Sequence, residues 1–205
     1  MSSYKLHYFN ARGRAEVSRL IFVVAGEKFE DARIEMNDWP NHKASMPLGQ
    51  LPVLEYNGKK IPQSISIARF LAKQFGLAGK DNLEQAQVDS VVDTIGDCVT
   101  KYVVARFEKD PEKKEAALKV FFSEELSKHL KNLETLANHY SNGGPYFVGN
   151  QLTLADLFFY DIGENFLQEN ANSLNEFPWL QKNRQQVASN PRIAEYVKNR
   201  APTPF

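Results

Sequence analysis

Two short stretches of the sequence combine residue types that could bind a ligand. Gln63 and Ser64 precede an apolar helical stripe, and the free N–H groups and the dipole at a helix N-terminus attract a carboxylate. Leu51-Pro52 leads into a predicted strand, where a cis peptide bond could expose the backbone of Leu51 to a ligand. Both stretches therefore predict contacts with a bound molecule.

A β-hairpin followed by a helix is expected to position these residues. Val53-Leu54 begins a strand, Asn57-Gly58 is typical of a type I′ turn, and Lys59–Ile61 returns antiparallel. Ser64 is predicted to be the N-cap of the helix and Gly76 its C-terminal stop. Taken alone, the segment is better explained by an ordinary hairpin and a well-capped helix that bind nothing, since strand-turn-strand-helix units are common.

The composition argues against several classes of protein. The chain has 205 residues, enough for two small domains or one large one, and Lys plus Arg equals Asp plus Glu at 25 each. A net charge of zero argues against a nucleic-acid partner or an anionic membrane surface. Cys98 is the only cysteine, which excludes an intrachain disulfide and a Cys-x-x-Cys redox or zinc site. The longest apolar run, Leu20–Ala25, is too short to span a bilayer and no signal-peptide core is present, so we expect a soluble cytoplasmic protein.

The first part of the chain alternates strand and helix patterns. Tyr4–Phe9 alternates as a half-buried strand, and Val17–Val24 carries the apolar face of a helix that Gly26 ends. Phe29–Met36 is predicted to be a second, more polar strand, and Asn37–Gly49 an irregular, partly helical segment. With the hairpin and its helix the order is β-α-β-α-β-β-α, which predicts a mixed sheet with a parallel part. This is the thioredoxin-like order without the redox cysteines.

Strand signals disappear after a linker at Leu77–Asn82. We therefore predict a thioredoxin-like domain at residues 1–78 and an all-helical domain at 83–205. Thr153 and Asp156 have the spacing of a capping box that begins one of its helices, with Leu152 and Leu157 as a hydrophobic staple. Apolar stripes predict further helices along Val88–Tyr102 and Glu112–Tyr140, which the Asp110-Pro111 pair separates. Two shorter helices are predicted near Pro178–Ser189 and Arg192–Arg200.

The sequence resembles the cytosolic glutathione transferases. Gln50-Leu-Pro-Val-Leu followed by Gln63-Ser-x-x-Ile-x-Arg-Phe-Leu is similar to their glutathione-binding half, and the capping motif at Thr153 is a second, independent match. Four further motifs resemble the sigma class, so the resemblance runs the whole length: Tyr4-Lys-Leu-x-Tyr-Phe-Asn10, Gly13-Arg14-Ala-Glu16, Asp38-Trp-Pro40 and Arg200-Ala-Pro-x-Pro.

The resemblance implies that Tyr8 and Arg14 are the catalytic residues. A free thiol has a pKa near 8.5 and is mostly protonated at neutral pH, although the thiolate is the nucleophile. A hydroxyl that binds S⁻ better than S–H lowers that pKa, and this is the role implied for Tyr8. Arg14 is implied to support the Tyr8 hydroxyl and the charge of the thiolate. The alternatives are a packed strand tyrosine and a solvated arginine.

The same resemblance implies which residues bind glutathione. The glycyl end would contact Trp39 and Lys43, with Gln50 beside them. The backbone of Leu51, fixed by Pro52, would pair with the tripeptide, and the γ-glutamyl carboxylate would be held by Gln63 and Ser64. Further contacts are implied for Tyr8, Phe9 and Arg14.

Three acidic residues lie four apart on the long predicted helix: Asp89, Asp93 and Asp97. A solvated helix face explains them, but like charges at this spacing repel weakly. The resemblance implies instead that Asp97 faces the γ-glutamyl amine bound by the partner subunit of a homodimer. Gly96 stands where prostaglandin-synthesising members have a further acidic residue for a divalent cation, so no metal is expected.

The function that the resemblance implies is glutathione transfer. The Tyr8-stabilised thiolate would attack a hydrophobic electrophile, for detoxification, in an apolar pocket formed with the helical domain, and Phe9, Gly13, Val104 and Phe205 would line it. Val104 replaces a large aromatic residue of the prostaglandin-synthesising members. The alternatives are a glutathione-dependent prostaglandin D isomerase and a non-catalytic, crystallin-like or ligand-carrying member.

Overall fold

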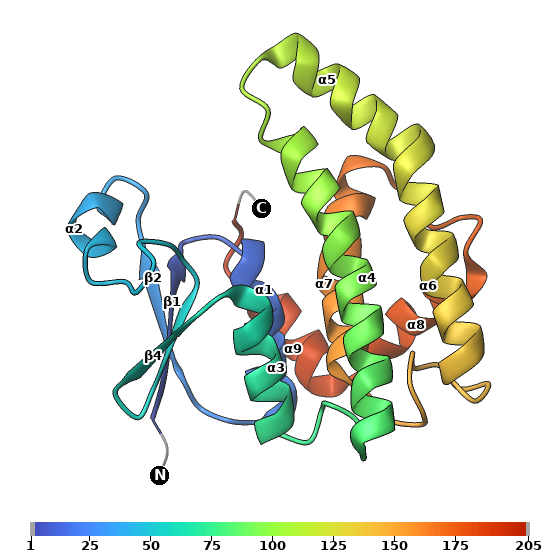
Figure 1. The fold of residues 1–205 in the computed structure, drawn as a ribbon, viewed down its shortest axis with the longest axis horizontal. Coiled ribbons are helices and arrows are strands. Elements are labelled where there is room, and N and C mark those ends of the chain that lie inside the picture. The colour runs from blue at the N-terminus through green and yellow to red at the C-terminus, as the bar shows by residue number, and fades with distance from the viewer. Residues whose placement is uncertain (1–2, 204–205) are drawn as a thin grey trace. The chain divides into compact units, whose positions relative to one another are not determined.

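The structure is a computed structural model that describes residues 3–203. The chain divides into two compact units (Figure 1). The first contains the residues up to Leu77 together with those from Asn190 onward, and the second is Ala78–Ser189.

A mixed sheet forms the centre of the first unit. Its strands are β1 (Tyr4–Phe9), β2 (Glu30–Ile34), β3 (Val53–Tyr56) and β4 (Lys59–Pro62), in the order β2-β1-β3-β4. β1 pairs parallel with β2 and antiparallel with β3. This arrangement confirms the predicted mixed sheet, although β2 is shorter than the predicted Phe29–Met36 strand.

Helices pack against this sheet in the order that the sequence predicts. Figure 1 shows α1 (Glu16–Ala25) and α3 (Ser64–Gln74) together on one face. Val17, Leu20 and Ile21 on the apolar face of α1 are buried because they recur at helical spacing, and Val24 is half-buried. The helix ends at Gly26, whose φ of 68° is the left-handed conformation that glycine favours. The remaining helical segments of this unit are η1 (Gly13–Ala15), α2 (Trp39–Lys43) and α9 (Pro191–Asn199).

The hairpin forms as predicted, but the start of α3 differs. Asn57 and Gly58 both have positive φ, 50° and 77°, as a type I′ turn requires. Ser64 was predicted to be the N-cap, and this is wrong: Ser64 is the first helical residue and Gln63 is the N-cap. The reason is the backbone of Gln63, whose φ of 75° and ψ of 112° are not helical. No side chain caps this helix end.

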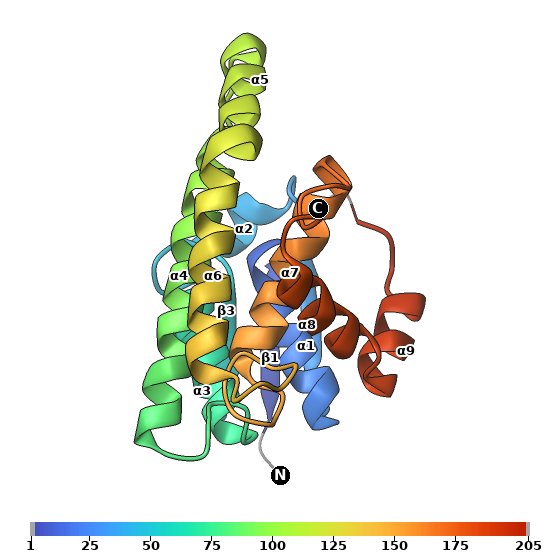
Figure 2. The ribbon, with the colours of Figure 1, turned by 90° about the vertical axis from the view of Figure 1, so that its right-hand side faces the viewer.

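The second unit is helical. Asp110 accepts hydrogen bonds from the N–H groups of Glu112 and Lys113, which explains why a new helix begins at Pro111. Figure 2 shows α5, the π-helical turn η2 and α6 running end to end. The elements are α4 (Asn82–Arg106), α5 (Pro111–Val120), η2 (Phe121–Glu125), α6 (Leu126–Tyr140), α7 (Leu154–Glu169) and α8 (Pro178–Ala188).

The last helix lies in a different unit from the one expected. The sequence assigned all of 83–205 to the helical domain, whereas α9 packs on α1 in the first unit. Two long-range contacts explain this: Arg192 donates to the carbonyl of Val24 at 2.6 Å, and Tyr196 donates to Glu16 at 3.1 Å. Among the helices of residues 3–203, none has both the length and the apolar character needed to cross a membrane.

Candidate functional site

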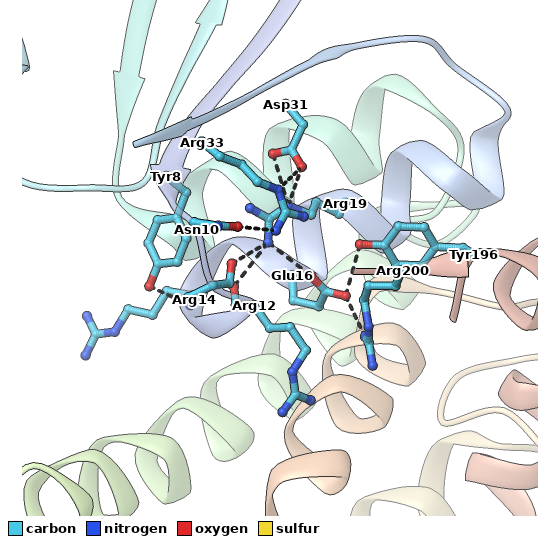
Figure 3. Close-up of polar contacts among 11 residues, drawn as sticks. Tyr8, Asn10, Arg12, Arg14, Glu16, Arg19, Asp31, Arg33, Tyr196 and Arg200 are labelled. Carbon is cyan, nitrogen blue, oxygen red and sulfur yellow. Dashed lines mark hydrogen bonds and ion pairs between the residues drawn. The ribbon is translucent and has the colours of Figure 1, made fainter. Parts of the chain in front are cut away.

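Tyr8 lies near the end of β1, with its side chain directed into the start of the helix that follows. Only 7% of the residue is exposed, and its ring packs with Leu6, Ala11 and Ala15. Its Oη accepts a hydrogen bond of 3.0 Å from the backbone N–H of Arg14. The Arg14 side chain is exposed, so it is the Arg14 backbone that contacts the hydroxyl (Figure 3).

Gly13 allows this close approach. Its φ is +41°, and a Cβ at this position would lie 2.5 Å from Oη of Tyr8 and 3.0 Å from a ring carbon. A side chain here would therefore both strain the backbone and displace the hydroxyl. The turn before α1 is built around the Tyr8 hydroxyl.

A buried polar network lies beneath this turn (Figure 3). Arg19, only 1% exposed, donates through Nη1 to the carbonyl of Ala11 at 2.8 Å and to Glu16 at 3.1 Å. Its Nε donates to both carboxylate oxygens of Asp31, at 3.1 and 3.2 Å. Burial alone would lower the pKa of Arg19, but the carboxylates of Asp31 and Glu16 raise it, so Arg19 is a permanent buried cation.

Glu16 is the buried anion of this network. It is completely inaccessible to solvent, and besides Arg19 it accepts hydrogen bonds from Tyr196 at 3.1 Å and Arg200 at 2.7 Å. Three donors compensate for the loss of water around this carboxylate. Burial and the neighbouring charge of Glu16 raise the pKa of Tyr196, so its hydroxyl remains a neutral donor.

Trp39 and Leu51 lie close to Tyr8, with Phe9 between Trp39 and the tyrosine. The ring of Trp39 meets the edge of Phe9 at a centroid distance of 5.5 Å, and Phe9 in turn meets Tyr8 at 5.6 Å. Leu51 packs against both the Tyr8 cluster and the cluster that holds Trp39. The exposed Lys43 lies over Gly49, next to Gln50, since a Cβ on that glycine would be 3.4 Å from Cε of Lys43.

The strand register places Gln63 and Ser64 beside the segment that contains Leu51 and Pro52. Val53 pairs with Pro62, so the residues that follow Pro62 lie next to those that precede Val53. The peptide bond between Leu51 and Pro52 is cis, the geometry that the sequence suggested, and Pro52 is buried. Gln63 is exposed and Ser64 is half-buried at the N-terminus of α3. Every predicted glutathione-binding residue except Asp97 thus belongs to the first unit, and Tyr8, Phe9, Trp39 and Leu51 form one connected cluster within it.

Asp97 lies exposed on α4 in the second unit. Cys98 beside it is buried, and burial raises the pKa of its thiol to about 12, which leaves it protonated at neutral pH. Val104, a predicted wall of the electrophile pocket, is 70% exposed, and Phe205 lies outside the described residues. Within residues 3–203 no three His, Cys, Asp or Glu side chains are grouped so that they could hold a metal ion.

Sequence reasoning did not identify Glu16, Arg19 or Asp31. A signal was present: Glu16 and Arg19 are spaced i, i+3 within a helix whose other residues are mostly apolar. A charged pair inside an apolar helix favours a buried ion pair, but its partners at Asp31, Tyr196 and Arg200 are distant in sequence.

The chain combines a thioredoxin-like unit with a helical unit, and a tyrosine hydroxyl lies near the end of its first strand. This is the architecture of glutathione transferases. The family description "Glutathione S-transferase, N-terminal domain" matches residues 4–73, and "Glutathione S-transferase, C-terminal domain" matches residues 96–200. The chain therefore belongs to the glutathione S-transferase family, whose members use glutathione as a co-substrate.

Relatives and solved structures agree with this assignment. The chain is 39% identical to S-crystallin SL11 of Nototodarus sloanii, with all of both chains covered. It is 41% identical to hematopoietic prostaglandin D synthase of Mus musculus, with 99% of each chain covered. A monomeric glutathione S-transferase from the hookworm Necator americanus superposes with a TM-score of 0.90 at 36% identity, covering 99% of this chain and 100% of that one. The chain is a glutathione S-transferase enzyme.

Proposed function

We propose that Tyr8 activates glutathione in this transferase by donating its hydroxyl proton in a hydrogen bond to the thiolate. The observation that carries the proposal is the bond of 3.0 Å from the Arg14 N–H to Oη of Tyr8. A hydroxyl that accepts a hydrogen bond becomes a stronger donor, because neighbouring bonds polarise one another. The turn with Gly13 and Arg14 therefore both fixes the hydroxyl and strengthens it as a donor to sulfur.

The reaction then needs no covalent step on the protein. The thiol proton passes to solvent, and the sulfur lone pair forms a new carbon–sulfur bond with the electrophile. The leaving group departs with the electron pair of the bond that breaks. Tyr8 accelerates this reaction because it raises the fraction of glutathione present as thiolate at neutral pH.

We assign the binding of glutathione to residues of the first unit. Lys43 and Trp39 would hold the glycyl end, Gln50 would lie beside them, and Leu51 would offer its backbone as an added strand does. Gln63 and Ser64 would hold the γ-glutamyl carboxylate, since the free N–H groups and dipole of an eleven-residue helix begin there. The ring contacts that connect Tyr8, Phe9 and Trp39 support this assignment, as does the strand register, in which Val53 pairs with Pro62.

The finer assignments are also proposals. We infer a sigma-class, cytoplasmic homodimer that conjugates hydrophobic electrophiles in detoxification, in which Asp97 contacts the γ-glutamyl amine bound by the partner subunit. The sigma-class motifs around Tyr8, Arg14 and Trp39 support the class. The exposed position of Asp97 on α4 leaves its carboxylate accessible to a second subunit.

Isomerisation of a prostaglandin is the second candidate function. The 41% identity to the mouse prostaglandin D synthase favours it. Gly96 and Val104 argue against it, because they replace the acidic and aromatic residues that the prostaglandin-synthesising members have there. The similarity to S-crystallin SL11 favours a non-catalytic role, and the intact Tyr8, Arg14 and Gln63-Ser64 set argues against that role.

The test of the proposed function is Tyr8→Phe, which keeps the ring and deletes the donor. Charge-assisted hydrogen bonds contribute about 1.5–3 kcal/mol, so the pKa of bound glutathione should rise by about one to two units. Turnover of chlorodinitrobenzene at neutral pH should fall by about tenfold to a hundredfold, and the deficit should shrink as the pH rises. The direct measurement is the thiolate absorbance of bound glutathione against pH. Identical titrations and unchanged turnover in the two proteins would reject the role of Tyr8.

A further inference from the structure

Arg19 contacts the turn that presents its backbone to Tyr8. Its Nη1 bonds the carbonyls of Ala11 and Arg12, at 2.8 and 3.4 Å, which are the two residues directly before Gly13 and Arg14. Its guanidinium carbon lies 6.0 Å from the centroid of the Tyr8 ring. One buried side chain therefore contacts both the turn and the tyrosine (Figure 3).

The remaining contacts of Arg19 fix its own position. Nε donates to both oxygens of Asp31 on β2, and Nη1 donates to Glu16 on its own helix. Asp31 also accepts from Arg33 at 2.9 Å, so it is held from two sides. A guanidinium can satisfy carboxylates and carbonyls at once because its donors form a rigid planar fork, which the single ammonium of lysine lacks.

A gain in folding stability does not by itself explain why this buried network is present. Replacing a buried ion pair with well-packed apolar residues is often neutral or stabilising, because removing charges from water is costly. A buried network can instead hold a backbone segment in one conformation. Here that segment is Ala11–Arg14, the turn whose N–H group bonds the Tyr8 hydroxyl.

We propose that Arg19 is a positioning residue for thiolate formation: it holds the Ala11–Arg14 turn against Tyr8 and thereby directs the Tyr8 hydroxyl toward the sulfur of glutathione. This inference rests on the proposed role of Tyr8 and deepens it. Arg19 itself, with 1% of its surface exposed, does not contact the substrate.

The test is a double-mutant comparison of Arg19→Lys, Tyr8→Phe and the two combined, with the pKa of bound glutathione as the readout. Arg19→Lys keeps the charge but cannot bond Asp31 and two carbonyls together, so it should raise that pKa by about half a unit to one unit. Turnover of chlorodinitrobenzene at neutral pH should fall by about threefold to tenfold. In the Tyr8→Phe background the same substitution should change the pKa no further, because its effect passes through the hydroxyl.

Arg192→Lys is the matched control. Arg192 also bonds a backbone carbonyl of α1, that of Val24, but at the opposite end of the helix from Tyr8. In Arg192→Lys the pKa of bound glutathione should equal that in the unmodified protein. Circular dichroism and the Kd for glutathione should show that each variant is folded.

Two results would overturn the inference: an unchanged pKa in Arg19→Lys, or an equal shift with and without the Tyr8 hydroxyl. If Tyr8→Phe alone leaves the titration unchanged, the proposed function fails, and the inference fails with it. If Tyr8→Phe raises the pKa of bound glutathione but Arg19→Lys does not, only the inference about Arg19 fails. If Arg19→Lys does not fold, Glu16→Gln gives the same comparison, since it keeps the shape of Glu16 and removes the charge that Arg19 bonds.

Discussion

The backbone at Gly13 limits which residue can stand next to the Tyr8 hydroxyl. Its φ is +41°, which non-glycine residues adopt only with strain, and a Cβ would lie 2.5 Å from Oη. These two costs are separable, because Gly58 has a φ of +77° with nothing within 4 Å of a Cβ. If substituting Gly13 costs more stability or activity than substituting Gly58, the difference is due to the contact with Tyr8.

We therefore expect Gly13→Ala to impair thiol activation as well as stability. Gly58→Ala should lower the free energy of unfolding by about 1–2 kcal/mol because of the positive φ, and Gly13→Ala should lower it further because its Cβ also clashes with Tyr8. Only Gly13→Ala should raise the pKa of bound glutathione and lower turnover at neutral pH, by about tenfold, since Oη must move away from the sulfur. Denaturant unfolding and the thiolate titration measure the two effects. Equal activities in the two variants would contradict the proposed geometry of the turn.

At the scale of the helix, Asp156 organises the start of α7. It completes the capping box with Thr153, whose N–H and Oγ1 donate to it at 2.8 and 3.0 Å. It also accepts from the N–H of Phe147 at 2.8 Å and from Asn183 at 2.7 Å, so it joins a loop and α8 to the cap. Burial raises the pKa of Asp156 to about 6, although these hydrogen bonds oppose the rise.

Asp156→Ala should consequently destabilise the second unit much more than the loss of an ordinary helix cap. It leaves several buried donors without their acceptor, which should cost about 3–5 kcal/mol. The control is Asp110→Ala, which removes the exposed N-cap of α5 and should cost about 1 kcal/mol. Thermal unfolding of both variants measures the difference. Similar melting temperatures would show that the buried contacts of Asp156 add nothing to its role as a cap.

Features with local causes were predictable from the sequence. Asn57-Gly58 predicted its turn and Thr153 with Asp156 predicted the capping box, because a few neighbouring residues determine each one. The N-cap of α3 was predicted one residue too late, at Ser64, because nothing in the residue type of Gln63 indicates its positive φ. The network of Glu16 and Arg19 joins residues more than 180 positions apart, such as Glu16 and Arg200, which helical periodicity cannot reveal.

At the scale of the whole molecule, the open question is whether a second subunit completes the glutathione site. The hookworm structure that superposes on this chain is described as monomeric, so the shared fold does not determine the oligomeric state. Asp97 is exposed on α4, and a solvated helix face would explain it equally well. The proposal that it acts across a dimer interface therefore needs a test that distinguishes contacts within one subunit from contacts between two.

Mixing two defective variants provides that test. Asp97→Asn and Ser64→Ala should each weaken glutathione binding by about tenfold or more, because each removes a hydrogen bond to a charged group of the ligand. If Asp97 acts on the partner's site, a heterodimer of the two variants has one site with both defects and one site with neither. Random pairing makes half of the dimers heterodimers, so refolding an equimolar mixture should restore near-normal affinity at about one quarter of all sites, measured by calorimetric titration with glutathione. Glu115→Gln, which removes an exposed charge on α5, should leave the Kd unchanged. A monomer in sedimentation velocity, or mixtures that never recover affinity, would place Asp97 outside any shared site.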